Sequence, residues 1–202
     1  MKRTDAAETA LKIADLIQRG VRKFRSLTMK DLPLLAILPW LKLQSDLGTD
    51  KEIDWDALVP RVFEIIIFGS VAKEDREEVG DIDFMVLDNG CMSEFFTSKH
   101  KEDDWYQYLW ENMCLLLSGW LNYTEEQMDE VLAGIETDLH VLPLKMLKSK
   151  DLRAEFSCRH ADARFFQNAF STMLRYERGK LIPTDIAYFE EKYKVDLSDL
   201  KS

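Results

Sequence analysis

The chain has 202 residues, of which 46% are hydrophobic and 32% are charged, and its formal net charge is -10. These fractions are typical of an ordinary globular protein and exclude the fibrous and intrinsically disordered classes. The negative net charge opposes sequence-independent binding to a phosphate backbone, so long nucleic acids are not expected as partners.

The chain before residue 60 is predicted to be mostly helical. Apolar residues recur at helical spacing over 6–24, which predicts an opening amphipathic helix. The apolar segment 31–43 contains two prolines, so we expect short helical pieces there, followed by a polar turn at 46–51. A short helix is expected at 54–59.

Two apolar runs predict neighbouring strands at 62–68 and 81–86. The first run is rich in β-branched residues and ends abruptly at Gly69 and Ser70 instead of fading into a polar loop. The connection 71–80 is too charged to belong to a core, and we expect it to begin with a helical turn.

Another helix pair and a third strand are predicted in the middle of the chain. The aromatic stripe of a long helix at 101–121 is typical of core packing rather than cofactor binding. Thr124 and Gln127 have the spacing of a capping box, which predicts a helix that runs to about residue 134. The third strand is predicted at 137–142.

The end of the chain is predicted to be helical. From residue 154 onward the apolar residues have helical spacing, with a break at 179–183 and a last helix at 185–193. The complete pattern predicts an α/β (α+β) protein with a small mixed β-sheet flanked by helices and a C-terminal helical extension.

Neither a membrane protein nor a secreted, disulfide-bonded protein is indicated. The longest apolar stretches, at 32–43 and 109–121, are too short or too interrupted to span a bilayer, and the N-terminus lacks a signal peptide's apolar core. Cys91, Cys114 and Cys158 are widely spaced and odd in number, so we expect reduced thiols and neither a disulfide framework nor a zinc site. A cytoplasmic location is therefore expected.

Asp81 and Asp83 begin the second predicted strand and lie two residues apart. A strand sends both side chains to the same face, where two like charges are unfavourable unless a cation joins them. Proteins hold Mg²⁺ in this way, with one or two carboxylates, and the phosphates of a substrate complete the coordination. Gly69 would let a phosphate approach the backbone, and the hydroxyl of Ser70 can donate a hydrogen bond to it.

A catalytic metal centre usually needs a third acid, and the strand at 137–142 offers one. Asp138 lies inside the apolar run, whereas Glu136 lies at its edge, so Asp138 is the preferred candidate. His140 shares the predicted face of Asp138. We interpret it as a locally satisfied strand residue and leave a role in proton transfer open.

The order of these features resembles the DNA polymerase β-like nucleotidyltransferase superfamily. The shared pattern is an apolar strand, Gly69-Ser70, a short loop, Asp81-Ile82-Asp83, and Asp138 on a later strand. The run from Phe68 to Lys73 is most similar to the minimal nucleotidyltransferases, although Glu74 stands where small members often have glycine. The resemblance covers about residues 60–145.

This resemblance implies transfer of a nucleoside monophosphate from a nucleoside triphosphate to an acceptor hydroxyl, with release of pyrophosphate. The residues implied in holding Mg²⁺ or Mn²⁺ and in catalysis are Asp81, Asp83 and Asp138, the last of which would also activate the acceptor. The residues implied in binding the nucleotide are Gly69, Ser70 and Lys73. Residues 1–150 would form the nucleotidyltransferase-like domain with its N-terminal helices, and 151–202 a C-terminal helical region packed on it.

The acceptor is left open between a small molecule, a protein hydroxyl and an RNA end. A protein partner or a homodimer is also left open. Four basic residues are interpreted either as contacts for phosphate or acceptor or as surface charges: Lys145, Lys148, Arg159 and Arg164. The alternative function is that of a catalytically inactive nucleotidyltransferase-fold binding module, or an antitoxin-like partner of another protein.

Overall fold

The computed structural model describes residues 1–26, 61–89, 136–159 and 163–201, with residues 124, 126, 127 and 130 between them. Within this part of the chain, five strands form one mixed sheet in the order β3-β2-β1-β4-β5. The strands are β1 (Val62–Phe68), β2 (Asp81–Asp88), β3 (Glu136–Pro143), β4 (Met173–Glu177) and β5 (Lys180–Thr184). β2 and β3 run parallel, whereas the other neighbours run antiparallel.

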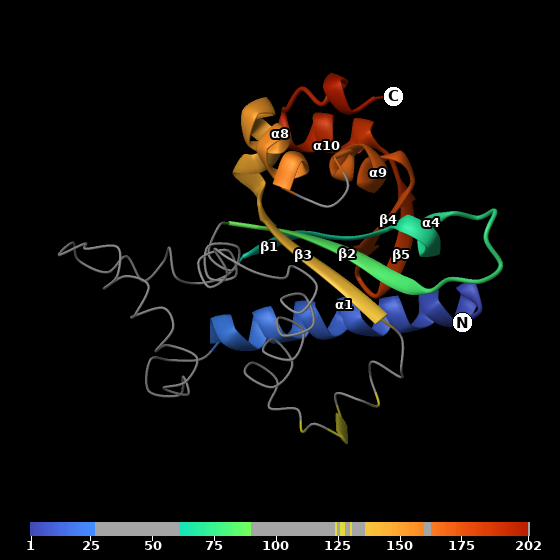
Figure 1. Ribbon diagram of the computed structural model, residues 1–202. Helices are drawn as coiled ribbons and strands as arrows, with labels where there is room; N and C mark the ends of the chain where they lie inside the picture. The colour runs from blue at the N-terminus through green and yellow to red at the C-terminus, as the bar shows by residue number, and fades with distance from the viewer. Residues whose placement is uncertain are drawn as a thin grey trace.

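Helices cover both faces of the sheet, so the molecule has three layers (Figure 1). Helix α1 (Arg3–Ser26) lies along one face, and the short α4 (Gly69–Ala72) follows β1 directly. The other face is covered by η2 (Leu144–Lys148), α8 (Lys150–Arg159), α9 (Phe165–Ser171), α10 (Ile186–Tyr193) and η3 (Ser198–Leu200). The prediction of a mixed sheet flanked by helices is confirmed.

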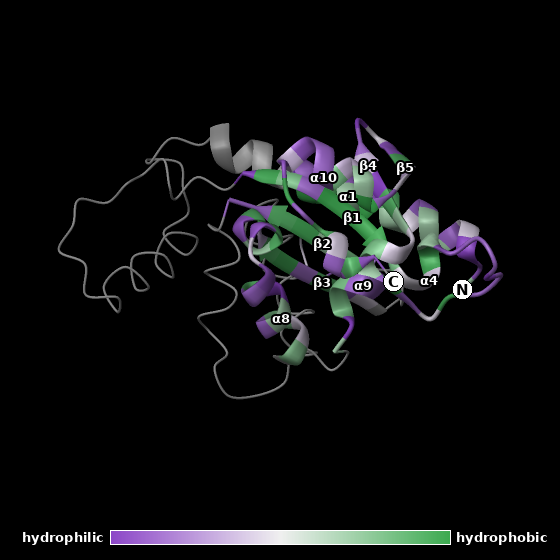
Figure 2. Cartoon of the chain, turned by 90° about the horizontal axis from the view of Figure 1, so that it is seen from above, coloured by the Kyte–Doolittle hydropathy of each residue, from purple (hydrophilic) through white to green (hydrophobic). Residues whose placement is uncertain are grey.

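Two hydrophobic cores separate the layers, because successive residues of a strand point to opposite faces. Ile65 and Ile67 of β1 pack in the first core with the apolar face of α1. Ile66 and Phe68 pack in the second core with the C-terminal helices. Figure 2 shows hydrophobic residues along the central strands, as a sheet buried on both faces requires.

Most predicted elements that fall on described residues are confirmed. The opening helix, the first three strands and the last helix lie within two or three residues of their predicted bounds. The capping box is also present: Thr124 N donates to Gln127 Oε1 at 3.0 Å, and Gln127 N donates to Thr124 Oγ1 at 3.3 Å. The predictions that lie outside the described residues are those at 31–43, 46–51, 54–59 and 101–121, and those on Cys91 and Cys114.

The prediction of helix after residue 154 is wrong from residue 173 to the predicted break at 179–183, because β4 and β5 form a hairpin over 173–184. Phe166, Phe170 and Met173 have helical spacing, but Met173 already begins a strand. Arg178 and Gly179 both have positive φ, at 50° and 79°, as a two-residue hairpin turn requires. The glycine that was interpreted as a helix break is therefore a hairpin signal.

The hairpin joins the C-terminal part of the chain to the central sheet. β4 pairs with β1 through Ile66 opposite Arg175 and Ile67 opposite Leu174. Strands from both sides of residue 150 thus belong to one sheet. None of the described helices combines the length and apolar character that a membrane-spanning helix needs.

Candidate metal centre

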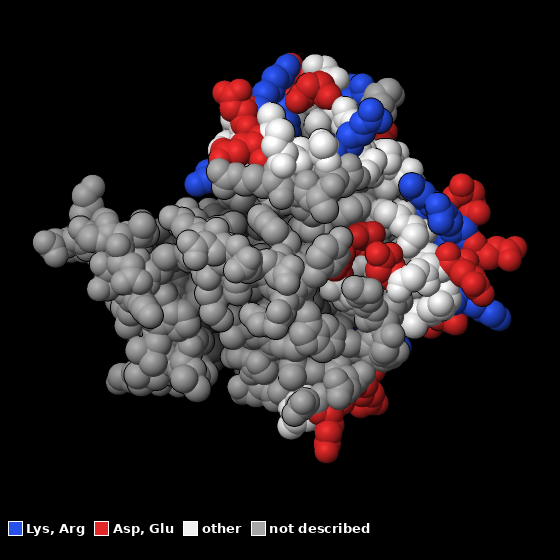
Figure 3. All heavy atoms as spheres, viewed as in Figure 1, with Lys and Arg blue, Asp and Glu red and all other residues white. Residues whose placement is uncertain are grey.

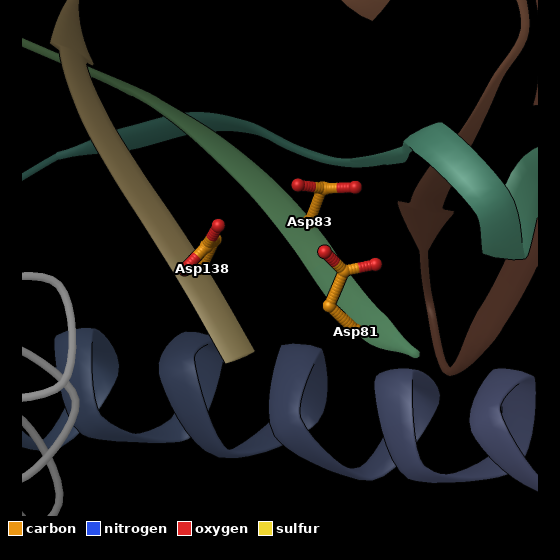
Figure 4. Close-up of side chains that lie close together, drawn as sticks. All are labelled: Asp81, Asp83 and Asp138. Carbon is orange, nitrogen blue, oxygen red and sulfur yellow. The ribbon is translucent and has the colours of Figure 1, made fainter. Parts of the chain in front are cut away.

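Three carboxylates meet where the parallel strands β2 and β3 begin. Asp83 of β2 lies directly opposite Asp138 of β3 in the register, and Asp81 precedes Asp83 by two residues on the same face. One oxygen from each carboxylate lies within 4.8 Å of the others. Figure 4 shows the three side chains projecting from the face of the sheet that is turned away from α1. The structure therefore brings together the three acids that the sequence singled out.

The carboxylates lie where the apolar layer above the sheet ends. Further along β2 on the same face, Met85 and Leu87 are fully buried in the second core, whereas all three aspartates are partly exposed. In the space-filling view, acidic side chains reach the surface near the middle of the view, between the layers of the molecule (Figure 3). The site is thus accessible to solvent on one side and backed by packed strands on the other.

Gly69 is required by the close approach of Asp83. It has a φ of 66°, in the left-handed region that glycine occupies without strain. A Cβ at this position would lie 2.0 Å from Asp83 Oδ2, far inside van der Waals contact. The glycine at the end of β1 therefore makes room for a carboxylate of β2.

Ser70 faces the carboxylates from α4. Its hydroxyl donates to the carbonyl oxygen of Asp81 at 3.4 Å and is 3.5 Å from Asp81 Oδ1. Both contacts are long, so they hold the hydroxyl weakly. Ser70 is therefore placed beside the first carboxylate and can turn to another oxygen ligand at little cost.

The carboxylates repel one another. The pKa of Asp83 is raised from 3.8 to about 7 by burial and by the neighbouring charges of Asp81 and Asp138, while the charge of Lys73 opposes the shift. Desolvation and like charge both disfavour the ionised form. A divalent cation bound between these oxygens would relieve both costs, and a donor set of carboxylate oxygens alone suits Mg²⁺ or Mn²⁺. The residues present therefore fit the metal that the sequence implies.

His140 belongs to an aromatic cluster rather than to the open part of the site. Only 5% of it is exposed, and its ring centroid lies 4.6 Å from that of Phe165 and 6.0 Å from that of Phe68. Phe165 also contacts Phe68 edge-on at 5.5 Å. These three rings link the strand before Gly69 to the strand of Asp138.

The basic residues considered from the sequence lie in different places. Lys145 and Lys148 belong to η2, which follows the C-terminal end of β3, whereas Asp138 lies near the N-terminal end of that strand. Arg164 is the N-cap of α9 and directly precedes Phe165 of the aromatic cluster. The side chain of Arg159 lies outside the described part of the chain, as does that of Glu136, whose backbone is opposite Asp81.

The sequence did not indicate two features that lie next to the site. The first is the contact of Phe165 with His140 of β3. The helical pattern assigns its neighbour Phe166 to a core, but it does not indicate which strand Phe165 contacts. The other feature is a pairing between the N-terminal residues and the loop before Asp81, where Lys2 forms a β-bridge with Glu78. Neither contact has a local sequence signal, because each joins segments far apart in the chain.

Comparisons of the chain with protein-family models, with curated proteins and with solved structures gave no match.

Proposed function

We propose that the chain is a metal-dependent nucleotidyltransferase that moves a nucleoside monophosphate from a nucleoside triphosphate to an acceptor hydroxyl and releases pyrophosphate. The observation that carries this proposal is the meeting of Asp81, Asp83 and Asp138 within 4.8 Å, beside the glycine at the end of β1. The sequence resemblance to polymerase β-like nucleotidyltransferases supports it, because all parts of the shared pattern meet at one place.

Each residue of the site has a role that follows from its position. Asp81 and Asp83 would hold the metal, which supplies positive charge to the oxygens of the transferred phosphoryl group. Asp138 would hold it from the opposite strand and accept the proton of the acceptor hydroxyl. Ser70 would donate a hydrogen bond to the leaving phosphates. Lys73, whose charge acts on Asp83, would contribute a second positive charge on the donor side.

The backbone supports an in-line displacement in two ways. The parallel ladder fixes Asp83 opposite Asp138, so the carboxylates are in place before any ligand binds. Gly69 has no Cβ, so the Asp83 carboxylate can lie against the turn at the end of β1 without a clash. The acceptor remains a small molecule, a protein hydroxyl or an RNA end. Location in the cytoplasm remains part of the proposal.

The first test is removal of the metal-binding charges. Asp81→Asn combined with Asp83→Asn should abolish Mg²⁺-dependent binding of a nonhydrolysable nucleoside triphosphate, measured by calorimetric titration with and without Mg²⁺. Loss of the repelling charges should leave the melting temperature unchanged or raise it. The matched control is Glu74→Gln combined with Asp75→Asn, which removes two exposed charges from the neighbouring loop.

The outcomes separate the two functions that the sequence left open. Binding that is lost in the site variant and kept in the loop variant supports the transferase. If the unaltered chain binds no triphosphate in the presence of Mg²⁺ but forms a stable complex with a second protein, the transferase proposal is rejected in favour of a binding module.

A further inference from the structure

The loop that carries the chain from α4 to Asp81 is attached to the N-terminal residues by antiparallel backbone pairing. Val79 N donates to the carbonyl oxygen of Met1 at 3.0 Å, and Met1 N donates back to Val79 O at 3.1 Å. Arg3 N donates to Glu77 O at 2.9 Å. Lys2 and Glu78 lie between these bonded pairs as a β-bridge. We call this pairing of residues 1–3 with 77–79 the N-terminal clasp.

The clasp is also fixed by side-chain burial. Val79 is only 5% exposed and lies in the first core, together with Ala6 and Ala10 of α1. At the other end of the loop, Val71 and Ala72 of α4 are buried, and Val71 lies in the same core. Figures 1 and 2 both show the N-terminal end of α1 beside the loop that joins α4 to β2.

The clasp ends two residues before the first carboxylate of the site. Val79 is held by two hydrogen bonds and by burial, and only Gly80 separates it from Asp81, where β2 begins. Gly80 is exposed, and a Cβ built on it would meet open space. Without the clasp, the start of β2 would be held by its ladder with β3 and by the long hydrogen bond from Ser70 to Asp81 O, at a terminal residue where strands fray.

We propose that residues 1–3 are a positioning element of the metal site, which holds the start of β2 so that the Asp81 carboxylate stays within reach of Asp83 and Asp138. This inference rests on the proposed function, because it assigns the clasp a part in metal binding. On this proposal, the residues of the clasp act on the site through their backbone hydrogen bonds.

The test uses the full chain with Arg3→Pro, which removes the one N–H that bonds Glu77 O. Proline is tolerated at the first position of a helix, where its missing N–H has no intrahelical partner. Arg3→Ala is the matched control, because it removes the same side chain and keeps the N–H. Val79→Ala is a second variant that weakens the other side of the clasp by reducing its burial.

Two readouts are needed. Hydrogen exchange at the amides of residues 77–81 should speed up in Arg3→Pro and not in Arg3→Ala. The dissociation constant for Mn²⁺, measured by titration of its paramagnetic resonance signal, should rise about two- to tenfold in Arg3→Pro, the range expected when one such hydrogen bond is lost. The melting temperature of Arg3→Pro should lie at most a few degrees below that of Arg3→Ala, as the loss of one hydrogen bond predicts. Val79→Ala should also raise the Mn²⁺ dissociation constant.

The result that overturns the inference is equal Mn²⁺ affinity in Arg3→Pro and Arg3→Ala while exchange at 77–81 differs, because the clasp would then be structural only. Equal exchange in both variants would also overturn it, since the bond would not hold the loop. If the unaltered chain itself binds no Mn²⁺, the proposed function fails and the inference fails with it. That outcome is distinguishable, because it appears before any variant is compared.

Discussion

At the scale of single residues, one methyl group added at Gly69 should have a large effect on both stability and binding. Gly69→Ala would place a Cβ 2.0 Å from Asp83 Oδ2 and impose the strain of a φ of 66° on alanine. The strain alone costs about 1–2 kcal/mol. We expect that cost in the free energy of unfolding from urea titration, together with loss of Mg²⁺-dependent triphosphate binding, because the Asp83 carboxylate must move.

Gly179→Ala is the control for this change. Its φ is 79°, so the strain is similar, but no atom lies within 4 Å of an added Cβ. The control should lose a comparable amount of stability and keep triphosphate binding. Normal binding in Gly69→Ala would contradict the close approach of Asp83.

The raised pKa of Asp83 predicts an unusual dependence of stability on pH. Burial and the charges of Asp81 and Asp138 raise this pKa from 3.8 to about 7, so over that interval the folded chain holds a proton that the unfolded chain releases. The contribution of Asp83 to stability is therefore fully present below about pH 4 and is lost as the pH rises through about 7. Most paired carboxylates show the opposite sign.

The measurement is the free energy of unfolding at several pH values between about 4 and 8, in buffer free of divalent cations. Relative to Asp83→Asn, the unaltered chain should lose at most about 1.4 kcal/mol per pH unit in this window. Added Mg²⁺ should reduce the loss, because the ion binds the deprotonated carboxylate. Parallel curves for the two proteins in the absence of metal would contradict the shift.

At the scale of elements, α10 is fixed to the sheet by a buried carboxylate. Glu64 of β1 is 3% exposed, and its Oε1 accepts hydrogen bonds from Tyr188 at 3.1 Å, Lys192 at 2.5 Å and Tyr193 at 2.5 Å. Burial opposes the charge of Lys192, but the hydrogen bonds to Glu64 and Tyr188 outweigh it and the pKa of Lys192 is raised. A charge inside a core is tolerated here because three donors meet it.

Removal of one of these donors should be costly. Tyr193→Phe should lower the free energy of unfolding by about 2 kcal/mol, as expected for a hydrogen bond to a buried charge. Tyr176→Phe is the comparison: Tyr176 donates to Asp15 at 2.8 Å, but that carboxylate is 44% exposed and water can replace the bond. A loss of about 0.5–1 kcal/mol is expected there. Equal losses would contradict the assigned role of burial.

Elements with strong local signals were predicted correctly, and the error came from a competing pattern. The strands at 62–68 and 81–88 combine apolar runs with clear ends, and the capping box needs only four residues. The hairpin at 173–184 was missed because Phe166, Phe170 and Met173 continue a helical period into a segment that pairs with β1. Tertiary pairing overrode local periodicity at this point.

At the scale of the whole molecule, the sequence indicated the class of fold and the three acids. It did not indicate the long-range contacts that place the three acids together. Alternation placed Asp81 and Asp83 on one face, and the register of the parallel ladder then set Asp83 opposite Asp138, which no spacing in the chain specifies. The contact of Phe165 with His140 and the N-terminal clasp depend on the assembled layers. Long-range contacts of this kind leave no periodic trace in a sequence.

The distance between the backbones of Asp83 and Asp138 is set by the hydrogen bonds of the ladder rather than by side-chain packing. Neighbouring strands lie about 4.8 Å apart whatever side chains they carry. Core residues above and below the sheet can therefore be exchanged for others of similar volume at a modest cost in stability, without a change in the distance between the two strands. A chain can diverge at nearly all its core positions and still keep this site, provided that it retains the register of β2 and β3 and the glycine beside Asp83.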